Sequence, residues 1–524
     1  MSRRDVQRPV VNSRTNNLLW RAAWMVLVLF ALGCGADDTG PPDPPSSSDG
    51  DGGQPAVRES WDAQFLKGAK VGYSHTRVTT AEEHGRVLET WTNTTRLTVS
   101  RDRQKLTQEL VSTSVETPDG RIIRFDTSVG GGGGETQIQG YLRDGKLVAT
   151  VKTQGQSVPR EIDWDPAWGG FFAVEQALED QPMQPGERRR LTALMPFFVQ
   201  PAKVSLEAFD YEETPLLSGT RELLRIKKTI AIPDSDEVVE WIWCDRAGVP
   251  LRSELVGGLG GESYRTTKEV AVRQLDDVAF DLFRETTIKI EPPLTNPHRR
   301  RRIVYQVLVK DADPAKIFAT DARQLIERNS DDSMALTVLA SGLRETPPVE
   351  GLADEPTAAD REPNSLVQSN DRRIQELAAS VAPDEQDKRQ IAAALEKFVG
   401  RYIERKNFSQ ALATAAEVAA TRQGDCTEHA VLLAALCRAR AIPARVAIGL
   451  VYSEKPQGFA YHMWNEVWIG DRWVPLDATL AIGGVGAAHL KIRHTNLHGV
   501  SPYAAFLPVY QVLGQLEIRI IEVE

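Results

Sequence analysis

Residues 422–445 read RQGDCTEHAVLLAALCRARAIPAR and contain the clearest structural signal in the chain. Gly424 should end the preceding helix, and Asp425 followed by Glu428 has the spacing of a capping box. We therefore expect a new helix to begin at Cys426. The unpaired N–H groups and the dipole of a first helical turn favour an anion, so this position suits a thiolate.

The segment after this helix has the pattern of antiparallel strands. We expect one strand over 446–452, followed by a hairpin in which FAYHMWNEVW (459–468) and WVPLDAT (473–479) flank a short turn with a glycine. Pairing Trp468 with Trp473 sets the register of that hairpin. Side chains on both strands then alternate between the two faces of one sheet.

In this register, His462 and Asp477 lie on one face of the sheet as diagonal neighbours. Diagonal pairs are about 7–8 Å apart, within reach of an imidazole and a carboxylate that lean together. The sequence therefore predicts a contact between these side chains, close to the helix that starts with Cys426. In such a set, His462 takes the thiol proton, Cys426 attacks an amide or ester carbonyl, and Asp477 fixes the tautomer of the imidazole.

An acyl-transfer site also needs donors for the oxyanion and a surface for the substrate. The backbone N–H of Cys426 is one natural oxyanion donor, and the side chain of Gln423 is a candidate for the second. Trp464 shares a face with His462 by alternation and is a candidate for substrate binding, as is Gln423.

Two other residues of the helix are interpreted as supporting or core residues. His429 lies one turn after Cys426, where a side chain points along the helix wall. Cys437 is three turns from Cys426, about 16 Å at 1.5 Å per residue, which excludes a disulfide between them. The same distance excludes a zinc site built from these residues and His462. We expect neither a metal nor a cofactor.

Together these pieces resemble the transglutaminase-like superfamily, which includes animal transglutaminases, peptide N-glycanases and many bacterial proteases. The matching pieces are GDC (424–426) with EHA (428–430), RARAIPAR (438–445), YHMW (461–464) with EV (466–467), and Trp473 with DAT (477–479). The resemblance covers roughly residues 365–485, although Ala478 stands where proline is common. It implies an α+β papain-like core, a helix bundle packed on an antiparallel sheet, with Cys426, His462 and Asp477 as catalytic triad.

The rest of the chain is expected to form two folded parts. Residues 303–524 would be the transglutaminase-like domain, with a strand over Ile303–Val309, helical segments at 371–381, 384–404, 408–421 and 501–513, and a closing strand at 515–524. Residues 57–295 have period-two alternation and turn signals, which predict a mostly antiparallel β domain, a curved sheet or half-barrel, with hairpins at 137–151 and 238–255. We expect this β-rich domain to bind or position a substrate, and Pro292–Arg302 to be a solvated linker.

The N-terminus has the features of an export signal. Five arginines and one acid precede an apolar run over 22–33, which ends in ALGC at Cys34. This ending resembles the bacterial lipoprotein signal and implies that residues 1–33 are removed and Cys34 is lipidated. The alternatives are a plain signal anchor or cleavage elsewhere. Residues 34–56 are rich in Pro, Gly, Ser and Asp and should be a disordered tether. We expect the protein at the cell envelope, facing the periplasm or the exterior.

Composition limits the partners. The 524 residues carry a net charge of −10, which does not suit nucleic acid, and four cysteines are too few for a disulfide scaffold. We expect a protein or peptide substrate, such as an envelope protein or a peptidoglycan peptide, and contact with the membrane through the lipid. The leading hypothesis is a protease or amidase. The alternatives are an acyltransferase that cross-links proteins, and a catalytically silent binding protein with the same fold.

Overall fold

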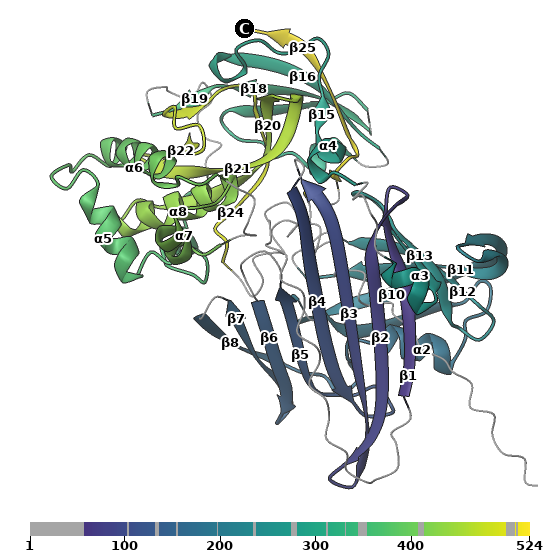
Figure 1. Cartoon of the computed structure of the whole chain (residues 1–524). Coiled ribbons are helices and arrows are strands. Elements are labelled where there is room, and N and C mark those ends of the chain that lie inside the picture. The colour runs from purple at the N-terminus through teal and green to yellow at the C-terminus, as the bar shows by residue number, and fades with distance from the viewer. Residues whose placement is uncertain are drawn as a thin grey trace, which may run out of the picture.

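The structure is a computed structural model, and it describes residues 57–101, 104–130, 136–153, 156–195, 197–233, 237–273, 280–310, 313–330, 332–343, 354–406, 413–498, 509 and 512–524. The expected signal peptide (1–33), lipidation site (Cys34) and tether (34–56) lie outside these residues. The described chain is mostly antiparallel β, with a large β domain first and the helices concentrated in the C-terminal half (Figure 1). Its helices are all too short or too polar to span a membrane.

The described strands between residues 57 and 266 form one antiparallel sheet of 14 strands. Its strands are β1 (Val57–Leu66), β2 (Ala69–Glu83), β3 (Arg86–Arg101), β4 (Gln104–Glu116), β5 (Ile122–Gly130), β6 (Thr136–Arg143), β7 (Lys146–Thr153), β8 (Gln156–Asp163), β9 (Arg188–Met195), β10 (Gln200–Leu216), β11 (Gly219–Ala231), β12 (Val238–Cys244), β13 (Pro250–Leu255) and β14 (Gly261–Thr266). Neighbours in sequence are neighbours in space except where β1 pairs with β14, which joins the runs β1–β8 and β9–β14. The two expected hairpins, β6–β7 and β12–β13, are confirmed.

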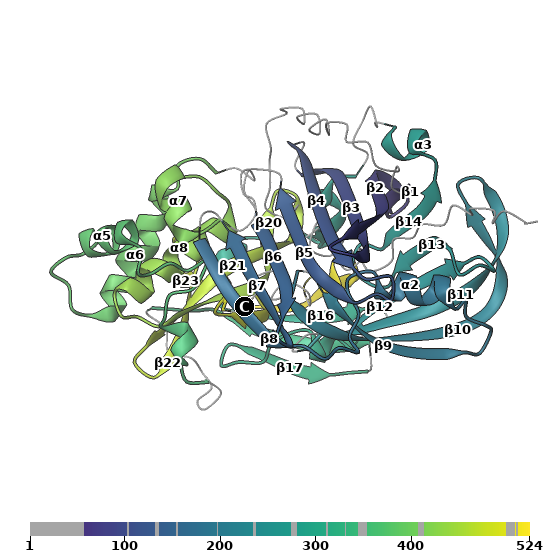
Figure 2. The same cartoon turned by 90° about the horizontal axis from the view of Figure 1, so that it is seen from below.

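The sheet curls around a short helix, α2 (Ala173–Asp180), as the view from below shows (Figure 2). Phe171 and Phe172, at the start of this helix, are fully buried, and their rings lie 5.0 Å from those of Phe125 and Trp91 respectively. On the other side, Arg189 of β9 donates a hydrogen bond to the backbone of the helix. The helix therefore fills the concave side of the sheet and contacts both of its arms.

The segment between the two halves contacts both of them. It contains α3 (Lys268–Val272), α4 (Leu282–Thr286), β15 (Ile288–Lys289) and the short 3-10 helix η2 (Pro297–Arg299). Helix α3 packs against β1 and β2, α4 packs mainly against β3, and β15 and residues 294–300 contact the C-terminal half. Leu294 N–H donates to the hydroxyl of Tyr452 at 3.0 Å, and Ala487 N–H donates to the carbonyl of Arg300 at 3.0 Å. The expected solvated linker is therefore confirmed only in part: residues 292, 293, 295, 296, 299 and 301 are exposed, but hydrogen bonds at Leu294 and Arg300 tie the segment to the C-terminal half.

The described residues of the C-terminal half form small antiparallel sheets and several α-helices. The strands are β16 (Arg302–Val309), β17 (Gln324–Arg328), β18 (Ser333–Leu339), β19 (Ser341–Gly342), β20 (Ala444–Glu454), β21 (Gln457–Ile469), β22 (Arg472–Leu476), β23 (Gly484–Val485), β24 (His489–Thr495) and β25 (Leu516–Val523). The helices are α5 (Arg372–Ser380), α6 (Lys388–Tyr402), α7 (Ala415–Thr421) and α8 (Cys426–Ala439). The sheet that positions the site has the order β15-β21-β20-β24, with β22 paired to the other part of β21. The expected closing strand is β25, which pairs with β16; most of the expected helix 501–513 lies outside the described residues.

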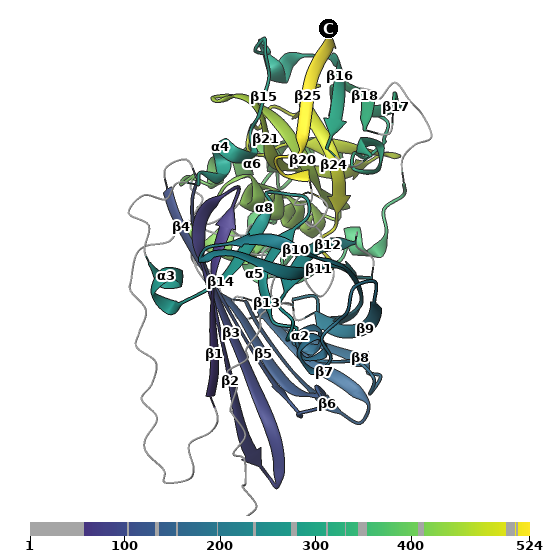
Figure 3. The same cartoon turned by 90° about the vertical axis from the view of Figure 1, so that its right-hand side faces the viewer.

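Helix α8 is the buried centre of this half. Every residue from Glu428 to Arg438 is buried, helices α5, α6 and α7 pack against α8, and α8 in turn packs against β20 and β21. Asn465 of β21 donates a hydrogen bond from its amide to the carbonyl of Ala430 at 2.8 Å, which ties the helix to the sheet. Figures 1 and 3 show this half above one end of the 14-stranded sheet, and Gln515 donates to the carbonyl of Gly258 between them at 2.7 Å.

Candidate active site

The helix predicted to begin at Cys426 does begin there. Asp425 is its N-cap, and its carboxylate accepts the N–H of Thr427 at 2.8 Å. The carboxylate of Glu428 accepts the N–H of Asp425 at 2.9 Å, which completes the predicted capping box. The Cys426 side chain, in the first turn, is partly exposed. The thiol is therefore accessible at the end of the helix where unpaired backbone N–H groups point outward.

Gly424 is expected to be essential for this turn. Its φ of +144° is rarely adopted by other residues, and a Cβ added here would lie 2.4 Å from Cβ and Cγ of Glu428. Gly424→Ala should displace Glu428, lower the free energy of unfolding by about 2 kcal/mol and strongly reduce reaction at Cys426. Denaturant unfolding and thiol labelling would measure both. Gly470→Ala is the control. Gly470 also has a positive φ, but a Cβ added there would meet no other atom, so only the stability of this variant should fall. Equal thiol labelling in the two variants would contradict the role of Gly424.

The predicted hairpin register is confirmed. Trp468 pairs with Trp473, and the ladder continues through Asn465 and Leu476. The two tryptophan rings lie 5.4 Å apart between their centroids. Asp477 is the first residue after β22, so the strand delivers its side chain to the sheet face that carries His462.

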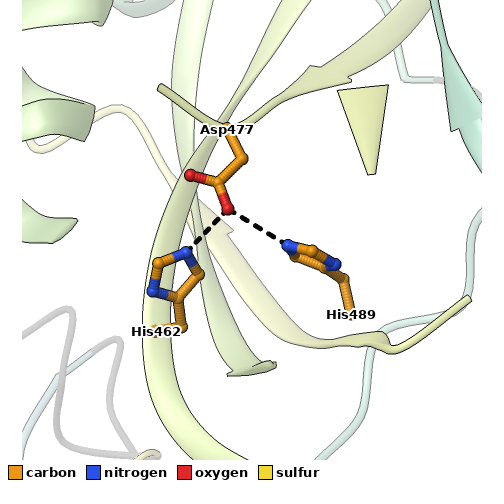
Figure 4. A group of neighbouring side chains, drawn as sticks. All are labelled: His462, Asp477 and His489. Carbon is orange, nitrogen blue, oxygen red and sulfur yellow. Dashed lines mark hydrogen bonds and ion pairs between the residues drawn. The ribbon is translucent and has the colours of Figure 1, made fainter. Parts of the chain in front are cut away.

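The structure brings together the three residues proposed from the sequence. His462 Nε2 lies 2.8 Å from Asp477 Oδ2, which is the predicted contact (Figure 4). Cys426 lies close enough to the same imidazole to raise its pKa. Asp477 is fully buried, and His462 is 8% exposed. Because Nε2 is engaged by the carboxylate, Nδ1 is the nitrogen that remains for the thiol.

Asp477 is held by four hydrogen bonds. Oδ1 accepts the backbone N–H groups of Thr479 at 2.9 Å and Leu480 at 3.4 Å, while Oδ2 accepts from His462 and from a second histidine, His489, at 3.1 Å. Burial alone would raise the pKa of Asp477, but the charge of His462 and the donors from both histidines hold this pKa well below its ordinary value. The carboxylate is therefore an anion with a fixed direction.

The charge of Asp477 acts in turn on His462. Burial on its own would lower the pKa of this imidazole, but the charge of Asp477 and the interaction with Cys426 outweigh burial and hold the pKa well above its ordinary value. The charged form of the imidazole is thus favoured beside Cys426. A thiol nucleophile requires such a base partner.

His489 was not identified from the sequence. It is fully buried, and burial lowers its pKa to about 4, so the ring is neutral and donates Nε2–H to Asp477. It lies on β24, which pairs with β20 and places His489 opposite Val451. No local pattern indicates that β24 pairs with β20, so only the sheet order could have revealed this contact.

His462, Asp477 and His489 also carry atoms that could bind a metal ion, all within 4.8 Å of one another. The separations of 2.8 and 3.1 Å between the ring nitrogens and Oδ2 are hydrogen-bond lengths. Neighbouring ligands of tetrahedral zinc would be about 3.3 Å apart, given bonds of about 2.0–2.1 Å. The group therefore fits hydrogen bonding better than metal binding.

The other site candidates lie around this set. Trp464 is 1% exposed, and its ring centroid lies 6.3 Å from that of His462 in a stacked arrangement, so it supports the imidazole and is too buried to contact a substrate. Gln423 is partly exposed and forms a backbone bridge with Arg405. Cys437 is fully buried and belongs to the core, where burial raises its pKa to about 12.

His429 points along the helix, as expected. Its Nδ1–H donates to the carbonyl of Asp425 at 2.6 Å, and burial lowers its pKa, so the ring is neutral and its side chain is directed at the helix backbone. His429 is therefore not placed as the base for Cys426.

Glu396 of α6 holds the backbone of the Asp477 loop. Its Oε1 accepts the N–H groups of Asp477 at 3.2 Å and Gly483 at 3.3 Å. Burial raises its pKa to about 7, even though these two donors favour the charged form. The loop after β22 is thus anchored by a carboxyl group that titrates near neutral pH.

This anchor should make stability depend on pH. Because the folded pKa of Glu396 lies above its ordinary value of 4.5, its stabilising contribution is present below about pH 4.5 and is lost as the pH rises through 7. Glu396→Gln imitates the protonated form, so it should match the wild type at pH 4.5 and be more stable by about 3 kcal/mol at pH 8.5. Urea unfolding at both pH values measures this. Glu376→Gln, on the exposed side of α5, is the control; an equal difference at both pH values for Glu396→Gln would contradict the assignment.

Comparison with known proteins places these residues in a recognised domain. Residues 375–478 match the family model of the transglutaminase-like superfamily, and the match contains Cys426, His462 and Asp477. The C-terminal half therefore carries a transglutaminase-like domain, as the resemblance in the sequence indicated. No curated protein matches the chain.

Several solved structures are similar to parts of this chain, all with low TM-scores. A proposed cysteine protease from Cytophaga hutchinsonii has 19% sequence identity and a TM-score of 0.27, and the similarity covers 43% of this chain and 87% of that one. A β-barrel-like protein of a domain of unknown function from Brucella abortus has 11% identity and a TM-score of 0.31, over 41% and 96%. A proposed protease from Parabacteroides distasonis has 10% identity and a TM-score of 0.18, over 66% and 64%.

Proposed function

We propose that this protein is a cysteine enzyme that cleaves amide bonds, as a protease or amidase, through a Cys426–His462–Asp477 triad. The observation that carries the proposal is the hydrogen bond between His462 and the buried Asp477 carboxylate, with the partly exposed Cys426 close enough to His462 to raise its pKa. Nucleophile, base and orienting group are the three parts that this chemistry requires.

The reaction follows from the atoms involved. His462 Nδ1 accepts the thiol proton, and the sulfur of Cys426 attacks the carbonyl carbon, so a C–S bond forms and the carbonyl oxygen becomes an oxyanion. The backbone N–H of Cys426 is a donor for that oxyanion. The imidazolium then gives its proton to the leaving amine as the C–N bond breaks. Water attacks the thioester, passes a proton through His462 to the sulfur, and releases the acid.

We place the enzyme at the cell envelope, held by a lipid on Cys34 and the tether 34–56, and facing the periplasm or the exterior. The support is the arginine-rich start, the apolar run and the ALGC ending of the signal. Its substrate would be a protein or peptide, such as an envelope protein or a peptidoglycan peptide. When cells are grown with a labelled fatty acid, the wild type should carry the label and Cys34→Ser should not. A Cys34→Ser variant that still carries the label would contradict this anchoring.

Two assays run in parallel test the reaction. The purified full chain is incubated with a peptide library to measure cleavage, and with an acyl-donor peptide and a labelled amine to measure transfer. Hydrolysis predicts cleavage that is lost in Cys426→Ala, with little amine incorporated. Predominant amine incorporation would show that the acyl acceptor is an amine, and the enzyme would then be a cross-linking acyltransferase. Absence of both reactions in the folded protein would support a silent binding protein instead.

A further inference from the structure

We propose that His489 is a positioning residue for the triad, which locks the Asp477 carboxylate so that Cys426, His462, Asp477 and His489 work as a set of four. This inference rests on the proposed function. His489 is fully buried and so does not touch a substrate. Its Nε2 lies 3.1 Å from Asp477 Oδ2, the same oxygen that His462 contacts, and the two rings approach this oxygen from different sides (Figure 4).

The hydrogen-bond pattern gives His489 a specific task. A carboxylate oxygen has two lone pairs, and Oδ1 of Asp477 already has two backbone donors. His462 occupies one lone pair of Oδ2, and His489 occupies the other. With all four positions filled, the carboxylate cannot turn without breaking several bonds. His489 thus keeps Oδ2 directed at His462 even when that ring moves to exchange its proton with the thiol.

The surroundings of His489 fix both its place and its tautomer. Arg323, itself 4% exposed, donates to the His489 carbonyl at 2.9 Å. The ring packs at steep angles against Trp464, His462 and His298, with centroid distances of 5.5, 6.0 and 5.9 Å. Its Nδ1 is buried with no hydrogen-bond partner among the described residues. A neutral ring that donates from Nε2 leaves Nδ1 unprotonated, which agrees with this environment, and the low pKa of His489 supports the neutral form.

The test compares side chains that place an N–H at different points. In His489→Gln the amide nitrogen lies where Nε2 lies, whereas in His489→Asn it lies nearer to Nδ1 and cannot reach Asp477. His489→Leu keeps the bulk and removes the donor. The full chain and each variant are reacted with a thiol-directed acyl probe at several concentrations. The data give two quantities for each protein: the maximal rate of Cys426 acylation and the probe concentration at which half of that rate is reached. His75→Leu, in the 14-stranded sheet, is the matched control.

We expect His489→Gln and His75→Leu to react within about 5-fold of the wild type. His489→Asn and His489→Leu should lose roughly 10- to 100-fold in the maximal rate, with little change in the half-maximal concentration, because a donor to a charged group is lost. A His489→Leu that reacts as fast as the wild type, or a His489→Gln as slow as His489→Asn, would overturn the inference. If His489→Leu does not fold, the Gln and Asn pair still decides.

A spectroscopic measurement separates this inference from the proposed function. In a ¹⁵N-histidine NMR spectrum at pH 7, the resonances that vanish in His489→Gln belong to His489. They should show a protonated Nε2 and an unprotonated Nδ1. An imidazolium or an Nδ1–H tautomer would overturn the positioning role whether or not the enzyme is active. If the wild type shows this tautomer but does not react with the probe, the proposed function is contradicted and the hydrogen bond from His489 to Asp477 is not.

Discussion

Cys426→Ala should abolish amide cleavage while leaving the protein folded. Without the sulfur no thioester can form, so the rate should fall by about 10⁴-fold or more. The side chain is partly exposed in the first turn of α8, and alanine is a good helix residue, so the free energy of unfolding should change by less than about 0.5 kcal/mol. Peptide cleavage and denaturant unfolding of the same preparations measure the two quantities.

Cys437→Ala is the matched control for this prediction. Cys437 lies on the same helix but is fully buried in the core. Its replacement should cost about 1 kcal/mol of stability and leave the cleavage rate nearly unchanged. Activity that survives in Cys426→Ala, or that disappears in a folded Cys437→Ala, would contradict the assignment of the nucleophile.

Asp477→Asn should be almost as damaging, for a reason visible in its hydrogen bonds. All four lone-pair positions of the carboxylate accept N–H donors. The NH₂ group of an asparagine would have to point either at the two histidines or at the two backbone N–H groups. In both orientations two hydrogen-bond donors would face each other, and hydrogen bonds to this side chain would be lost. If the NH₂ group faces His462, the ring is driven to the Nδ1–H tautomer and the thiol loses its base.

We expect the maximal rate for Asp477→Asn to fall by roughly 10³- to 10⁴-fold, and the free energy of unfolding by about 2 kcal/mol. Steady-state kinetics and urea unfolding would check these values. Asp471→Asn, at the exposed turn of the same hairpin, should behave like the wild type. A folded Asp477→Asn with more than a tenth of the wild-type rate would show that the carboxylate does not act as the orienting group.

Much of the candidate site could be predicted because its signals are local. The capping residues Asp425 and Glu428 place the helix start at Cys426, and both are found in those roles. The turn after Ile469 and the alternation on either side of it define the pairing of Trp468 with Trp473. The short turn fixes the register of the hairpin, and the register determines which side chains share a face of the sheet. The contact between His462 and Asp477 could therefore be predicted from the sequence.

The unpredicted features depend on contacts between distant segments. His489 approaches Asp477 because β24 pairs with β20, and nothing in HLKIRHT specifies that partner. Likewise, β1 pairs with β14 across some 200 residues, so hairpin signals could predict a curved sheet but not that its two runs of strands join into one sheet of 14. Trp464 was a candidate for binding because alternation shows which face a residue lies on, but not whether that face is covered.

The most direct test of the central claim is the reaction of the full chain with a thiol-directed acyl probe, in the wild type and in His462→Ala, followed by peptide mapping. If Cys426, His462 and Asp477 form one reactive unit, the wild type should be labelled at Cys426, and the folded His462→Ala should lose that labelling by at least about 100-fold. Equal labelling of Cys426 in the two proteins would show that the thiol does not depend on the imidazole, and would contradict the account.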